Sequence, residues 1–179
     1  MLYGESKDLF AHVGFYLYNF GAAEFHVTIL LWIFIGFQEP QAFFLLTKGM
    51  DAKAKIVRLK EAVALRGWTI GPNLKARLSH LSEAQANLRN RISHNYLDWK
   101  KDALEISNFS ALPTMPDLQI GPAPETIPSM SFFERGCWLN RLAVDFIDLT
   151  NTLPKFGEPF PPGILEIENP RSGVPTGAH

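Results

Sequence analysis

The sequence predicts an all-α protein, an up-and-down bundle of four to five helices with an irregular proline-rich loop before the last helix. Three observations favour this fold class. Apolar residues recur at three- and four-residue spacings over most of the chain. Strand-like sequence is confined to one short stretch, ALEISNF at 103–109. Prolines and glycines gather in two places, the loop 112–128 and the residues beyond Pro154.

The first predicted element is long and apolar. Residues 6–37 contain no proline and suit one long helix or two helices joined near Gly21. Their uncharged core, 27–37, has eleven residues, whereas a bilayer span needs about 20, and Glu24 and His26 would lie in the lipid. We therefore expect a helix buried in a bundle or at a subunit interface, without integral membrane insertion. A membrane-associated protein is the less favoured alternative.

Three further helices follow from the apolar spacing and from the positions of proline and glycine. Pro40 suits the first turn of a second helix, which ends at Gly67. A third helix begins near Pro72 and carries leucine and isoleucine residues at helical spacings. No regular element fits the loop 112–128. The last helix covers roughly 131–151.

Length and composition suit one compact domain. The chain has 179 residues, 46% of them hydrophobic, which is enough to bury one core. We expect a single helical domain over 1–153 and a Pro/Gly-rich tail over 154–179, disordered or draped over the surface. The single cysteine, Cys137, excludes an intrachain disulfide and fits a reducing, cytoplasmic environment. The first residues mix charged and apolar types, so we expect no secretory signal.

Charge is distributed unevenly, although the whole chain carries a net charge of −1. Residues 48–101 contain twelve basic and four acidic side chains, a net charge of +8, and the rest of the chain carries −9. Such asymmetry suggests a surface that attracts a polyanion. Two solvated helices with Lys and Arg on their outer faces would explain the charge equally well.

Common catalytic signatures are absent from the sequence. It contains no Walker loop and no GxGxxG, GxSxG or HExxH motif. The five histidines are scattered and there is no cysteine pair, so we expect no metal site and no cofactor. His12 and His26 lie in apolar sequence, where a core or interface role is commoner than ligand binding.

The stretch RNRISH, residues 89–94, is dense in groups that can handle a phosphodiester. Metal-independent RNA cleavage needs a base for the 2′-hydroxyl proton, an acid for the leaving 5′-oxygen and a cation for the phosphorane charge. Histidine titrates near neutral pH, and the arginine fork matches phosphate oxygens. The structural alternative is that these cations merely lie near a helix C-terminus, where the macrodipole favours them.

Helix geometry limits what one copy of this stretch can do. Asn90 and His94 are four residues apart and share a helix face, whereas Arg89 and His94 are about 140° apart around the axis. A long arginine reaching across, a distorted helix end or two copies meeting at a two-fold axis would bring both groups to one phosphate. Two copies would also supply a general acid and a general base from one histidine per chain, which predicts a homodimer.

RNRISH resembles the RNxxxH form of the R-x(4–6)-H motif of HEPN domains, the higher eukaryotes and prokaryotes nucleotide-binding superfamily. The resemblance extends over roughly 6–99 and to the last helix, because apolar helices are followed by a basic KIVRL helix and then by the motif helix. It implies an all-helical, commonly dimeric protein of toxin–antitoxin, defence or CRISPR ribonuclease systems, with an antitoxin or another protein as a partner.

The resemblance also implies roles for single residues. By position, Arg89 would be the catalytic arginine, Asn90 the polar residue beside it and His94 the catalytic histidine. Ser93 matches the small residue that often precedes the histidine, while Asn95 departs from the glycine that often follows it.

The function that these residues predict is metal-independent endoribonuclease activity on RNA, in a toxin or defence protein. The cations expected to contact RNA are Arg91, Lys55, Lys100 and Lys101. The alternative is a catalytically silent HEPN-like module that binds RNA, a nucleotide or a protein partner.

Overall fold

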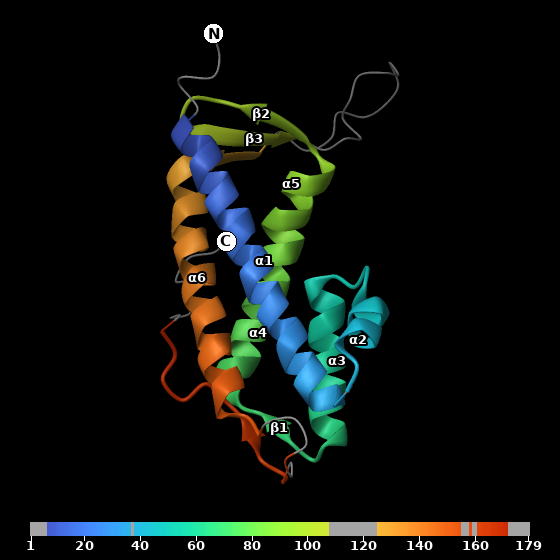
Figure 1. Ribbon diagram of the computed structural model, residues 1–179. Helices are drawn as coiled ribbons and strands as arrows, with labels where there is room; N and C mark the ends of the chain where they lie inside the picture. Colours follow the sequence, from blue (N-terminus) through green and yellow to red (C-terminus); the bar gives the residue numbers. More distant parts are fainter. Residues whose placement is uncertain (1–6, 37, 108–124, 155–157, 159–160, 172–179) are drawn as a thin grey trace.

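The computed structural model describes residues 7–36, 38–107, 125–154, 158 and 161–171, and Figure 1 shows their arrangement. The helices run alternately down and up in that view: α1 (Lys7–Ile35), α2 (Pro40–Thr47), α3 (Ala52–Leu65), α4 (Pro72–Ala84) and α6 (Ser129–Thr152). A short π-helix, η1 (Gln85–Arg89), and α5 (Asn90–His94) continue α4 without a break in direction. The predicted all-α fold with four to five helices is confirmed, since these continuations leave five helices among the described residues.

α1 is the central helix of the bundle. It is continuous past Gly21 and packs along α6, with α3 and α4 against its other side (Figure 1). Its fully buried side chains include Tyr16, Val27 and Leu30. A helix that is apolar on most sides is stable only when neighbours cover it, which explains its central place.

By length and composition, α1 is the one described helix that is able to cross a membrane. Other elements bury 44% of its most apolar window. The core helix of a globular bundle meets the same criteria, so this feature is weak support for a membrane span. Several large apolar side chains remain exposed on α1 and α2, including Tyr18, Phe25, Leu45 and Leu46.

The prediction of a single second helix from Pro40 to Gly67 is wrong in one respect, because this segment forms two helices, α2 and α3. The chain leaves α2 after Thr47 and turns at Gly49, whose φ of 84° is open to glycine but strained for other residues. Asp51 then begins α3 as its N-cap, and its carboxylate accepts a hydrogen bond from the Ala54 N–H at 2.8 Å. Pairing of a helix-ending glycine with a capping aspartate is the local signal for this break.

A three-stranded antiparallel sheet closes the end of the bundle where α5 ends (Figure 1). Its strands lie in the order β2 (Tyr96–Trp99), β3 (Ala103–Ser107) and β4 (Glu125–Pro128). The strand expected at ALEISNF is confirmed as β3, in which Leu104 and Ile106 are buried. The prediction that 112–128 has no regular element is wrong for β4, which pairs with β3, and the rest of that loop lies outside the described residues.

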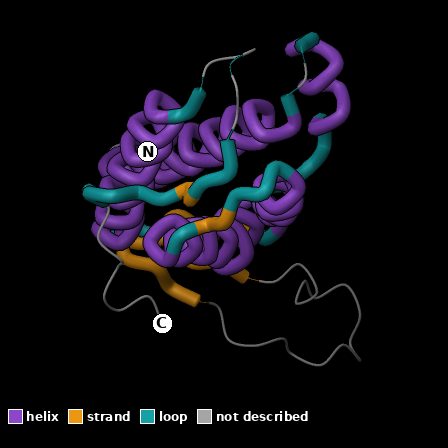
Figure 2. Tube along the Cα trace, turned by 90° about the horizontal axis from the view of Figure 1, so that it is seen from below, coloured by secondary structure: helices purple, strands orange, loops and turns teal. Residues whose placement is uncertain are grey.

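At the opposite end, part of the C-terminal segment packs on the helices. β5 (Ile164–Leu165) pairs in parallel with β1 (Thr69–Ile70), and Figure 2 shows this pair lying across the helix ends. Glu166 accepts hydrogen bonds from the Asn73 and Leu74 N–H groups, at 3.0 and 2.8 Å. The first turn of α4 thus receives its cap from a distant residue, so these residues are part of the folded core rather than a free tail.

Candidate functional site

The predicted motif begins within the π-helix η1, a conformation that is often found at functional sites. Two buried side chains hold this turn in place. The Tyr16 hydroxyl of α1 donates a hydrogen bond to the Ala84 carbonyl at 3.1 Å, directly before η1. The Gln85 side chain, only 4% exposed, accepts one from the Lys53 N–H at 2.9 Å. Burial raises the pKa of Tyr16, so its hydroxyl remains a hydrogen-bond donor across the physiological pH range.

Asp51 brings a negative charge to the same place. The hydrogen bond from the Ala54 N–H is the main cause that lowers the pKa of Asp51, and a hydrogen bond from Gln85 and the charges of Lys53 and Arg89 add to it. Its carboxylate therefore links the start of α3 to η1 and faces the charge of Arg89.

Arg89 lines a cavity of about 260 Å³ between α1, the link between α2 and α3, and η1. The other residues around this cavity are Phe20, Glu24, Gly49, Met50, Asp51, Ala52 and Gln85. The Arg89 Nη1 donates a hydrogen bond to the Asn90 Oδ1 at 3.2 Å, so the two neighbouring motif side chains lie together. A partly buried guanidinium with one hydrogen bond to a neutral amide keeps donors for an anion such as phosphate.

His94 lies at the other end of the motif, exposed, as the last residue of α5. The Ser93 hydroxyl donates to the Arg89 carbonyl at 3.0 Å, and the Asn95 side-chain amide donates to the Arg91 carbonyl at 2.9 Å. These bonds close the helix directly around His94, while no described residue forms a hydrogen bond or ion pair with its imidazole. His94 is not among the residues around the Arg89 cavity, so one copy of the chain does not bring the two side chains together there.

Most cations predicted to contact RNA have an acidic partner within the chain. Lys55 pairs with Glu24 at 2.8 Å, and Arg91 pairs with Glu125 of β4. Lys100 contacts Asp98 and lies 3.3 Å from Glu105, and its hydrogen bonds to these carboxylates raise its pKa. Lys101 is exposed. RNA would therefore have to compete with these carboxylates for three of the four cations.

The surroundings of Arg89 include four side chains that the motif alone did not predict: Glu24, Asp51, Gln85 and Tyr16. Two of them left a local signal: Gln85 is four residues before Arg89, and Asp51 is a capping residue two positions after Gly49. Glu24 is a charged residue in an apolar segment, which predicts a partner but not which one. Tyr16 left no signal that separates it from other core aromatic residues.

Within the described ranges, no group of three or more His, Cys, Asp or Glu side chains could hold a metal ion. His12 and His26 are both partly buried on α1, and the Nδ1 of His12 lies 2.8 Å from the Ser129 hydroxyl.

Comparison of the chain with protein-family models, with curated proteins and with solved structures found no significant match. The resemblance to HEPN domains therefore rests on the RNRISH motif and its place late in a helix, and it stays a prediction.

Proposed function

We propose that this chain is a metal-independent endoribonuclease that assembles its site from two copies. The observation that carries the proposal is the placement of His94 at the end of the motif helix, where its imidazole is exposed and forms no hydrogen bond or ion pair with the described residues. Arg89 lines a cavity that His94 does not line. A two-fold axis near the end of α5 would bring two His94 side chains to one phosphodiester, which no single copy does.

The two imidazoles would divide the proton transfers between them. In neutral form, one His94 accepts the 2′-hydroxyl proton as the 2′-oxygen attacks phosphorus, and the protonated His94 of the other copy donates a proton to the leaving 5′-oxygen. Arg89, whose long side chain would have to reach out of its cavity toward the same phosphate, stabilises the charge that develops on the phosphorane oxygens. The products are a 2′,3′-cyclic phosphate and a free 5′-hydroxyl, so no metal, water or further reactant is consumed in this step.

The first experiment is cleavage of a labelled mixed-sequence RNA by purified protein in excess EDTA. Wild type should cleave and leave 2′,3′-cyclic phosphate ends, and His94→Ala should lower the rate by at least about 10²-fold. The matched control is His80→Ala, which removes a histidine of α4 outside the motif and should retain cleavage once its folding has been checked. Absence of EDTA-resistant cleavage by folded wild-type protein would refute the proposal.

A second candidate function is a silent module that binds RNA or a protein partner without cleaving RNA. The ion pairs of Lys55, Arg91 and Lys100 favour it, because a site built for phosphate would leave more of its cations unpaired. This candidate predicts RNA or protein binding that Lys101→Glu weakens, with no turnover in any variant.

A further inference from the structure

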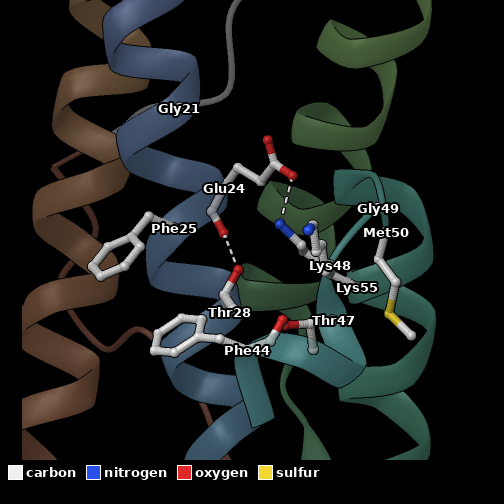
Figure 3. A pocket seen from close by; sticks show the side chains of 10 residues that line it. All are labelled: Gly21, Glu24, Phe25, Thr28, Phe44, Thr47, Lys48, Gly49, Met50 and Lys55. Carbon is white, nitrogen blue, oxygen red and sulfur yellow. Dashed lines mark hydrogen bonds and ion pairs between the residues drawn. The ribbon is translucent and has the colours of Figure 1, made fainter. Parts of the chain in front are cut away.

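A second hollow, drawn in Figure 3, lies beside the Arg89 cavity. Its volume is about 350 Å³, within the size range of about 300–1,000 Å³ that is usual for ligand sites. Glu24, Gly49 and Met50 line both the hollow and the Arg89 cavity. The two spaces are therefore neighbours, with Arg89 at one end, and we call them together the α1–α3 groove.

Two aromatic rings flank the hollow end of this groove. Phe25 comes from α1 and Phe44 from α2, and their side chains are 51% and 42% exposed. Figure 3 shows both rings on the same side of the pocket, with Met50 on the opposite side. Two phenylalanines exposed at one recess form an apolar surface that a flat apolar ligand could cover.

Polar groups of fixed position lie deeper in the groove. The Lys55 ammonium and the Glu24 Oε1 form an ion pair at 2.8 Å, with side chains only 14% and 20% exposed. The second carboxylate oxygen of Glu24 has no partner among the described residues and is free to accept a hydrogen bond. Lys48 is exposed beside Lys55 (Figure 3) and adds a second ammonium at the rim.

We propose that the α1–α3 groove binds one unpaired nucleobase of single-stranded RNA, next to the phosphate held at Arg89. The proposal rests on the ribonuclease function and names its substrate class. A nucleobase has flat apolar faces that stack on aromatic rings and an edge with both donors and acceptors. Phe25 and Phe44 offer rings on which a face of the base can stack, and the Glu24–Lys55 pair offers an acceptor and a donor to its edge.

Charge is consistent with this ligand. Three cations, Lys48, Lys55 and Arg89, and two carboxylates, Glu24 and Asp51, line the α1–α3 groove. The small net positive charge suits one base with its single phosphate, rather than a continuous polyanion. A base within a duplex would have to unpair before it entered the recess, so the groove should discriminate against double-stranded RNA.

The test measures binding without turnover, so that it does not depend on cleavage. The protein is the His94→Ala variant, and the probe is a fluorescein-labelled single-stranded RNA. Phe25→Ala and Phe44→Ala, each added to this variant, should raise the Kd by about 5- to 100-fold, the usual loss for one stacking ring. The same two substitutions should change the Kd for a duplex of the same sequence by less than about twofold.

Matched controls come from the same two helices. Tyr18→Ala on α1 and Leu45→Ala on α2 remove apolar side chains that are 76% and 71% exposed and do not line the groove. Both should leave the Kd within about twofold of the parent. Phe25→Leu, which keeps an apolar side chain without a ring, guards against a folding defect and should also weaken binding.

The proposal is overturned if the phenylalanine variants bind like the controls, or if the parent protein binds no single-stranded RNA. It is also overturned if light scattering shows that Phe25→Ala or Phe44→Ala disrupts a dimer, because the rings would then belong to a subunit interface. Failure of the ribonuclease itself has a different signature: wild type does not cleave, while the ring-dependent binding persists.

Discussion

Gln85→Leu tests whether the π-helix is held by the buried amide that joins it to α3. The substitution removes the oxygen that accepts the Lys53 N–H at 2.9 Å and the hydrogen bond to Asp51. Lys53 is in the first turn of α3, where N–H groups have no partner within the helix. A buried donor without a partner costs about 1–3 kcal/mol. Leucine fills a similar volume, so we expect no cavity cost and a total loss of about 2 kcal/mol.

The assay is urea unfolding followed by far-UV circular dichroism, with the free energy of unfolding extrapolated to water. The loss should lower the Tm by about 4–8 °C. Asn87→Leu is the matched control, because it makes the same kind of change at an exposed position of η1, and it should stay within about 0.5 kcal/mol of wild type. Equal stability of the two variants would refute the reasoning, since Gln85 would then contribute no more than a surface amide.

Two further perturbations test other parts of the structure. Because the folded protein lowers the pKa of Asp51, this carboxylate stabilises the fold above its ordinary pKa near 3.8, and the contribution is lost as the pH falls through the lower folded value. Asp51→Asn keeps an N-cap residue but removes this titration. Urea unfolding should therefore show that the free energy of unfolding of the variant lies below that of wild type at about pH 5, and that this difference shrinks as the pH falls to about 3. A difference that does not change with pH would contradict the assignment. Glu166→Ala removes the acceptor of the Asn73 and Leu74 N–H groups and should cost about 1–2 kcal/mol in thermal unfolding, whereas Glu168→Ala, on the exposed side of the same segment, should cost little.

The local pattern of the sequence was sufficient for most helices. α4 begins at Pro72 as predicted, and α6 extends the predicted helix 131–151 by only a few residues. These features depend on apolar spacing and on residues at helix ends, which act over a few positions. The same reasoning placed the RNRISH motif late in a helix, where α5 has it.

Pairings between distant segments were not predictable in this way. β4 reads as part of a proline-rich loop, and it is a strand because β3 offers it a partner edge. The residues that pair with β1 and cap α4 lie in a stretch that composition alone assigns to a tail. Short strands and caps of this kind gain their stability from a partner elsewhere in the chain, so their own sequence carries little signal.

The sequence by itself determined the helical class, most of the helices and the candidate residues Arg89, Asn90 and His94. Only the tertiary structure decided what surrounds them: Arg89 lies in a groove with Glu24, while His94 is exposed at the end of α5. The physical reason is the separation along the sequence of the residues that interact. Helical periodicity is set by neighbours three and four residues apart, whereas a groove exists only where helices distant in sequence pack together and leave side chains of each facing one space.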